Sequence, residues 1–178
     1  MSIAYKVLNL NEFCNSDFPP REHLLFPLIE RKGLSMIYGE RGGGKTFLGL
    51  SIALAVACGG QFLNFRANHP SKVLYIDGEM PARTLQERLN KLIPGFDQKL
   101  AMNNLHILTS DIQDTPIANL STTEGQEAIA PYLKDTDLVI IDNISTLCTF
   151  GRENESESWV PMQAWLLSLR RQGISVLL

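Results

Sequence analysis

Residues 39–46 constrain the fold more than any other part of the chain, because they read GERGGGKT and satisfy the pattern G-x-x-x-x-G-K-[ST]. This pattern needs a strand directly before it and a helix directly after it. Short apolar runs occupy residues 34–38 on one side and residues 47–58 on the other. A bilayer span needs ~20 apolar residues, so we interpret the second run as a buried helix. The chain should therefore fold as an α/β protein around this loop.

The composition of the loop predicts a phosphate-binding site. Its glycines let the backbone curl so that N–H groups face an anion, and the start of the following helix adds partial positive charge. Lys45 is expected to reach the β and γ phosphates of a nucleotide, and the Thr46 hydroxyl is expected to bind Mg²⁺. A glycine-rich turn without a ligand is the alternative. The residues expected to contact the nucleotide are Gly39, Glu40, Arg41, Gly42, Gly43, Gly44, Lys45, Thr46 and Phe47.

Strand-like and helix-like segments alternate along the chain, which is typical of a parallel sheet covered by helices. Continuous apolar runs predict strands that are buried on both faces. These runs lie at residues 34–38, 72–77, 105–109, 138–142 and 174–178. The expected fold class is therefore α/β with a mainly parallel sheet.

The spacing of apolar residues predicts helices at residues 81–93 and 159–171, the second with Ser158 as its N-cap. Residues 123–134 are a further helix candidate. Thr123 and Gln126 resemble a capping box there, although Pro131 interrupts the pattern.

The 178 residues, of which 44% are hydrophobic, predict one domain with a sizeable core. We expect residues 1–20 to be a lead-in, either an edge strand or an arm followed by a turn, and residues 21–178 to be the core. The net charge of −3 excludes binding of nucleic acid through bulk positive charge. Dispersed cysteines and histidines argue against a disulfide framework or a zinc site. Without a secretory signal pattern at the amino terminus, we expect a cytoplasmic protein that does not enter membranes.

Carboxylates at the ends of predicted strands are candidates for the chemistry. Asp142 ends the run DLVIID and is expected to lie beside the phosphate loop, where it can hold Mg²⁺ through water. Glu79 follows the strand at residues 72–77 and is expected to polarise a water molecule aimed at the γ phosphate. Asp77 is a rival for that role, or it holds the loop through bonds to backbone N–H groups. The expected catalytic residues are therefore Glu79 and Lys45, and the expected metal ligands are Thr46 and Asp142.

Together these motifs resemble the RecA-like ATPases. The resemblance rests on the phosphate loop, the acids in VLYIDGEMP, the strand end LVIIDN and the following GRENES loop, and it covers roughly residues 20–178. Within that family the chain is similar to hexameric replicative helicases of the plasmid and phage RepA type, with DnaB and RadA as more distant relatives.

The resemblance implies a three-layer α/β/α P-loop core that binds and hydrolyses ATP with Mg²⁺ in DNA replication or repair. It also implies a homo-oligomer, which is a hexamer in the full-length family. The loop at residues 151–157, with Arg152, Glu153 and Asn154, would face single-stranded DNA. Combined with the handedness of parallel crossovers, the resemblance places the last strand between the strands at residues 34–38 and 138–142.

Two parts of the family pattern, a polar sensor and a basic loop, are missing from this chain. The family continues beyond its last strand here into a polar sensor of the γ phosphate and a basic loop, whereas this chain stops at Leu178. We therefore expect a truncated core that binds nucleotide and hydrolyses it weakly or not at all.

Other nucleotide-binding classes compete with this interpretation. A GTPase is excluded because the one Asn-Lys pair, Asn90-Lys91, lacks the aspartate of N-K-x-D, and a ParA or MinD type ATPase is excluded because position 40 is Glu rather than Lys. A non-catalytic nucleotide-dependent switch or assembly module remains an alternative, as does a small-molecule kinase.

Overall fold

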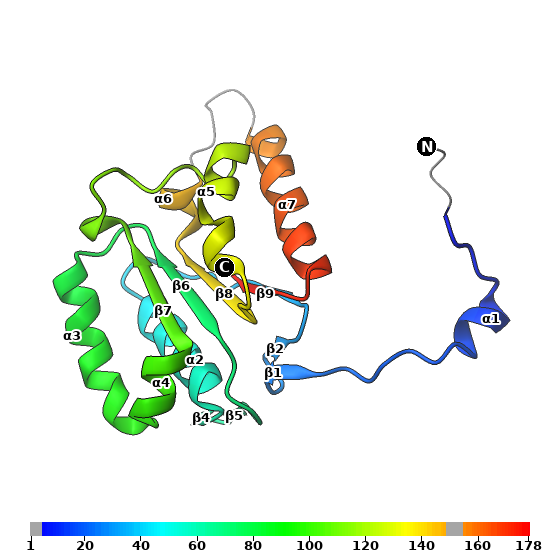
Figure 1. Cartoon of the computed structure of the whole chain (residues 1–178), viewed down its shortest axis with the longest axis horizontal. Helices are drawn as coiled ribbons and strands as arrows, with labels where there is room; N and C mark the ends of the chain where they lie inside the picture. Colours follow the sequence, from blue (N-terminus) through cyan, green and yellow to red (C-terminus); the bar gives the residue numbers. More distant parts are fainter. Residues whose placement is uncertain (1–4, 149–154) are drawn as a thin grey trace.

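The computed structural model describes residues 5–148 and 155–178, apart from the side chains of residues 155–158. At its centre lies a five-stranded parallel sheet with the order β3-β9-β8-β6-β7 (Figure 1). Its strands are β3 (Leu34–Ser35), β6 (Val73–Asp77), β7 (Leu105–Thr109), β8 (Leu138–Asp142) and β9 (Ser175–Leu177). The predicted order is confirmed, because β9 pairs with β3 on one side and with β8 on the other.

Strand β3 is shorter than the predicted run at residues 34–38. Leu34 and Ser35 pair with β9, and beyond them the contact continues as single backbone hydrogen bonds. The Leu178 N–H donates to Ser35 O at 2.9 Å, and the Ile37 N–H donates to Leu178 O at 2.7 Å. The segment thus follows the sheet as far as the loop at residues 39–46.

Helices cover both faces of the sheet (Figure 1). One face carries α2 (Lys45–Cys58), α3 (Ala82–Leu92) and α4 (Gln98–Asn104), and the other carries α5 (Thr123–Leu133), α6 (Ile144–Leu147) and α7 (Glu155–Arg171). Successive side chains of a strand point to opposite faces. Tyr75 and Ile140 therefore join the core beneath α2, whereas Ile76 and Ile141 join the core beneath α5 and α7. The three-layer α/β/α fold class is confirmed.

Helix α2 is the predicted buried helix, and a glycine stands at each end of it. Gly44 precedes the helix with φ of 83° and Gly59 follows it with φ of 63°, both in the left-handed region that favours glycine. A Cβ at position 59 would also lie 2.6 Å from the Pro70 nitrogen. The turn and the close approach together require glycine there.

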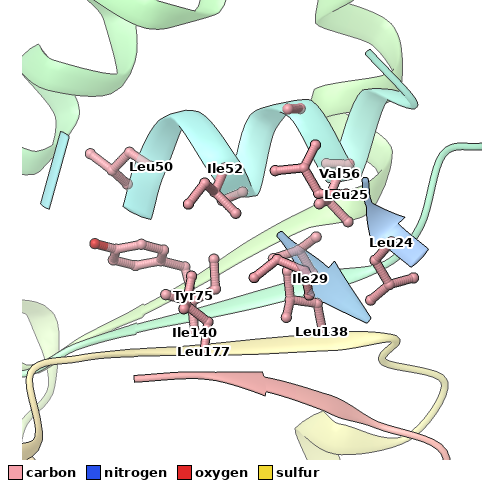
Figure 2. Close-up of a cluster of buried hydrophobic side chains, with 14 of the residues drawn as sticks. Leu24, Leu25, Ile29, Leu50, Ile52, Val56, Tyr75, Leu138, Ile140 and Leu177 are labelled. Atoms are coloured by element: carbon pink, nitrogen blue, oxygen red, sulfur yellow. The ribbon is translucent and has the colours of Figure 1, made fainter. Parts of the chain in front are cut away.

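The core beneath α2 fixes this helix on the sheet. Figure 2 shows Leu50, Ile52 and Val56 of α2 above Tyr75 of β6 and Ile140 of β8. All three α2 side chains are 0% exposed. Complete burial of such an aliphatic side chain contributes about 1.5–3 kcal/mol, so the packing holds the start of α2 at the end of the sheet.

Helix α5 begins at Thr123, as predicted, but its predicted cap is wrong by one residue. Thr122, not Thr123, is the N-cap, and its hydroxyl oxygen accepts a hydrogen bond from the Gly125 N–H at 3.2 Å. The side chain of Gln126 donates to Leu120 O at 2.9 Å instead of completing a capping box. Thr122 lies three residues before the Gly125 N–H, and this is the spacing that an N-cap needs.

The predicted start of helix α7 is also wrong, because the helix begins at Glu155 and Ser158 lies inside it. Glutamate is compatible with a helix interior, so the helix extends before the apolar stripe that predicted it. Helix α3 agrees with the prediction to within one residue at each end. Helix α4 was not predicted, since its seven residues offer too short a pattern.

The first described residues do not form the edge strand that we considered. They contain helix α1 (Leu10–Cys14), where Asn9 and Glu12 form a capping box, and this helix stands apart from the sheet (Figure 1). The remaining elements are β1 (His23–Leu25), β2 (Ile29–Glu30), β4 (Gln61–Phe62), β5 (Phe65–Arg66) and the 3-10 turns Ile93–Gly95 and Ser110–Ile112. Every helix in the described ranges is too short or too polar to span a lipid bilayer.

Candidate functional site

A cavity of about 740 Å³ opens where β6 and β8 end beside the start of α2. Ligands of α/β folds bind at the carboxyl ends of the strands. The predicted residues that line this cavity together are Gly39, Arg41, Gly42, Gly44, Lys45, Thr46, Phe47, Asp77, Glu79 and Asp142. Glu40 and Gly43, which were also predicted to contact nucleotide, are not among its lining residues. A second cavity of about 750 Å³ lies at the opposite ends of the strands, and its lining includes none of the predicted site residues.

The glycine-rich loop has a curled backbone. Gly42 and Gly44 have φ of 79° and 83°, conformations that residues with a side chain rarely adopt. The Lys45 ammonium donates to the carbonyl oxygens of Gly39 at 2.7 Å and Glu40 at 2.8 Å, which holds it inside the curl. An anion at this point would meet the lysine together with the free N–H groups at the start of α2. The geometry therefore fits a chain of phosphates.

Thr46 and Asp142 are the residues that fit a Mg²⁺ ion, because both offer oxygen to the same cavity. Within residues 5–148 and 155–178, no group of three or more His, Cys, Asp or Glu side chains could hold a metal. Mg²⁺ commonly takes one or two carboxylates and completes its shell with water and substrate phosphates. The donors present fit a metal ion that arrives with a nucleotide.

Asp77, the last residue of β6, is 2% exposed. Its Oδ2 accepts hydrogen bonds from the Met80 backbone N–H at 3.0 Å and from the Thr109 hydroxyl at 3.1 Å. Burial raises the pKa of this carboxyl above its ordinary value; these two hydrogen bonds oppose the rise, and the nearby carboxylates of Asp142 and Glu79 add to it. The contacts are those of a clamp on the loop that follows β6, which is the second of the two roles considered for Asp77.

Glu79 follows β6 by two residues and is exposed along the cavity wall. Its Oε2 accepts a hydrogen bond from the Asn143 side-chain amide at 2.6 Å. Asn143 Oδ1 accepts hydrogen bonds from the Thr146 N–H at 3.1 Å and from the Ser145 hydroxyl. Since Asn143 is the N-cap of α6, the same side chain starts this helix and holds Glu79.

Gly78 brings the loop after β6 against α6. Its N–H donates to Asp142 O at 2.9 Å. A Cβ at this position would lie 2.5 Å from Thr146 Oγ1 and 2.6 Å from Leu147 Cγ, far inside normal contact distance. Glycine therefore permits the close approach that sets Glu79 beside the end of β8.

Arg88 adds positive charge to the cavity wall, although no sequence motif singled it out. It projects from α3, and its Cζ lies 4.9 Å from the centroid of the Phe47 ring, within cation–π range. Asn143 and Gly78 were also missed. An amide directly after the strand-end Asp142 and a glycine between two acids are the signals that could have identified them.

The predicted DNA-contacting residues Arg152, Glu153 and Asn154 lie outside the described residues. The end of that predicted loop, residues 155–157, belongs to helix α7 instead.

Known proteins share the fold of this chain. A family model described as AAA domain matches residues 5–178, and no curated protein matches the chain. The crystal structure of the flagellar accessory protein FlaH from Methanocaldococcus jannaschii is similar, with a TM-score of 0.57 and 15% sequence identity over 83% of this chain. The crystal structure of the RadB recombinase is similar with a TM-score of 0.50 and 21% identity, also over 83% of this chain.

The chain spans 60% of the length of each of these two proteins. At such identities the likeness shows the fold alone. The family match over residues 5–178 and the two structural likenesses lead to one conclusion: the chain belongs to the AAA domain family and has the fold of a RecA-like P-loop ATPase.

Proposed function

We propose that this chain binds ATP with Mg²⁺ and hydrolyses it, as the motor core of a DNA replication or repair helicase of the RepA type. The observation that carries the proposal is that Lys45, Thr46, Glu79 and Asp142 line one and the same cavity. Phosphoryl transfer needs little from a protein beyond positioning and charge stabilisation. A lysine in a glycine-rich loop, two oxygen donors for a metal and one further carboxylate supply both.

Each residue then has one task. The Lys45 ammonium and the backbone N–H groups at the start of α2 bind the β and γ phosphates. The Thr46 hydroxyl and the Asp142 carboxylate hold Mg²⁺, which supplies positive charge against the phosphate oxygens when it is bound. The Glu79 carboxylate accepts a proton from the attacking water, and Asn143 holds that carboxylate in place through the 2.6 Å hydrogen bond.

The helicase part of the proposal rests on the motifs shared with the RepA type. Residues 21–178 would form the ATPase core and residues 1–20 an arm. The loop at residues 151–157 would contact single-stranded DNA, and the working form would be a homo-oligomer, a hexamer by analogy with the full-length family. The proposed setting is the cytoplasm, where ATP and single-stranded replication intermediates are available.

Calorimetry of ATP with Mg²⁺ tests the binding step. Lys45→Ala removes a charged donor that is worth roughly 1.5–3 kcal/mol in such contacts, so affinity should fall by at least about tenfold. Lys99→Ala, on the exposed surface of α4, removes the same charge elsewhere and should bind ATP as the wild type does. Equal affinities of the wild type and Lys45→Ala would refute the proposed site.

A non-catalytic switch or assembly module is the second candidate, and one contact favours it. Oε2 of the Glu79 carboxylate already accepts a hydrogen bond from the Asn143 amide, so this oxygen is engaged by the protein rather than by an attacking water. ATP turnover measured with and without single-stranded DNA separates the two functions. Turnover that rises with DNA supports the motor, whereas tight ATP binding with no turnover in either condition supports the switch.

A further inference from the structure

Tyr75 places a hydroxyl group inside the sheet beside the candidate metal ligand. It lies in the middle of β6, between β7 and β8, and its side chain is 0% exposed. Figure 2 shows its ring beneath α2, with the oxygen on the side away from Leu138, the first residue of β8. The hydroxyl donates a hydrogen bond to Asp142 Oδ2 at 2.6 Å.

Elements β6, β8 and α2 meet at this hydroxyl. A Cβ at Gly49 of α2 would lie 3.4 Å from the Tyr75 oxygen, so the helix that starts with Lys45 passes directly over it. Burial and the neighbouring Asp142 carboxylate raise the pKa of Tyr75 well above its ordinary value. The geometry of this bond makes the phenol its donor and the carboxylate its acceptor.

The hydrogen bond fixes one of the two oxygens of Asp142. Oδ2 is engaged by Tyr75, and in the proposed scheme Oδ1 is the oxygen that binds a metal-bound water or the metal itself. Groups that hydrogen-bond a metal ligand fix its orientation, and their loss typically costs 10–100-fold in metal affinity or activity. A phenylalanine would fill the same space in the core without offering this bond.

We infer that Tyr75 is a positioning residue that orients the Asp142 carboxylate and thereby sets how much Mg²⁺ the site needs to bind ATP; this inference rests on the proposed function. Tyr75 touches neither nucleotide nor metal in this scheme. It acts through Asp142 alone.

The test is a titration of ATP affinity against Mg²⁺ concentration for the wild type and Tyr75→Phe, by calorimetry, with a parallel measurement in EDTA. The Mg²⁺ concentration that gives half of the full affinity should rise by at least about tenfold in Tyr75→Phe. Affinity for ATP in EDTA should stay unchanged, because Lys45 and the loop are untouched. Tyr132→Phe, an exposed position on α5, is the matched control and should keep the Mg²⁺ requirement of the wild type.

A double-mutant cycle shows whether the hydroxyl acts through Asp142. In the Asp142→Asn background, Tyr75→Phe should no longer change the Mg²⁺ requirement. An unchanged requirement in Tyr75→Phe, or the same shift in both backgrounds, would overturn the inference. A metal-free Tyr75→Phe protein that fails to fold would also overturn it, in favour of a purely structural hydroxyl.

Failure of the proposed function gives a different pattern. In that case the wild type itself would not bind ATP, or Lys45→Ala would bind it equally well. Wild-type ATP binding that depends on both Mg²⁺ and Lys45, with no effect of Tyr75→Phe, would refute the role of Tyr75 alone.

Discussion

Substitution of Gly78 by alanine tests whether the contact between the β6 loop and α6 holds the site together. A Cβ there would lie 2.5 Å from Thr146 Oγ1, 2.6 Å from Leu147 Cγ and 2.9 Å from Leu147 Cδ2. Favourable contacts between heavy atoms lie near 3.5–4.0 Å, so each atom must move by about 1 Å. Overpacking of this kind typically costs about 1–3 kcal/mol.

Alanine also restricts the unfolded chain more than glycine does, which favours folding by roughly 0.4–1 kcal/mol. The contact energy exceeds this gain, so we expect Gly78→Ala to destabilise the protein by about 1–2 kcal/mol. For a chain of 178 residues, that loss lowers the melting temperature by about 2–8 °C.

The same displacement should reach the site. Helix α6 begins with Asn143 as its N-cap, and Asn143 holds Glu79. Any turnover by Gly78→Ala should therefore fall further than its ATP affinity, since the nearest atoms that the new Cβ meets belong to α6 and not to the phosphate loop.

Differential scanning calorimetry and ATP titration of the same samples measure both effects. Gly95→Ala is the control, because a Cβ at position 95 meets no atom within 4 Å, and its melting temperature should equal or slightly exceed that of the wild type. A Gly78→Ala protein that melts at or above the wild-type temperature would contradict the close approach of the β6 loop to helix α6.

Three further predictions concern the acids. Glu79→Gln keeps the shape of the side chain but removes its charge, so hydrolysis should fall by ~100-fold or more while ATP binding is retained; full turnover in Glu79→Gln, with loss in Asp77→Asn, would move the role to Asp77. Asp142→Asn should give a hydrolysis defect that varies with Mg²⁺ concentration, whereas a defect that is constant across a Mg²⁺ titration would argue against metal binding by Asp142. The raised pKa of Asp77 in the folded protein means that the unfolded chain ionises first as pH rises, so the wild type loses stability from the ordinary aspartate pKa up to the raised value. Asp77→Asn lacks this loss, and urea unfolding should therefore show its stability relative to the wild type improving as pH rises above the ordinary aspartate pKa, whereas a constant difference would contradict the shift.

The strands were predictable because their sequences carry the physical cause of their structure. Residues 138–141 are apolar at every position, as burial on both faces demands, and the bounds of β8 agree with the prediction at both ends. Helix caps were less predictable, since Thr122 and Thr123 both offer a hydroxyl group, and only the backbone geometry shows that Thr122 accepts the Gly125 N–H.

The residues of the site also fall into those that could be predicted from the sequence and those that could not. The loop at residues 39–46 is local in sequence, so its curl and its lysine could be predicted from the motif. The bonds from Tyr75 to Asp142 and from Asn143 to Glu79 join residues that are 67 and 64 positions apart. A tyrosine inside a buried run reads as core packing, and only the register of β6 against β8 brings its hydroxyl to a carboxylate.

The sheet has a hydrophobic core on each face, and this allows the coupling between the core and nucleotide binding to be measured. Ile140 and Ile141 are adjacent in β8, yet Ile140 packs beneath α2 and Ile141 packs beneath α5 and α7. Replacement of either residue by valine deletes one methylene and costs about 0.5–1.5 kcal/mol. The two variants therefore make the same small deletion on opposite sides of one strand, with a similar expected loss of stability. The difference between their ATP affinities then reports how strongly the core on the α2 side is coupled to nucleotide binding, separately from the general effect of destabilising the protein.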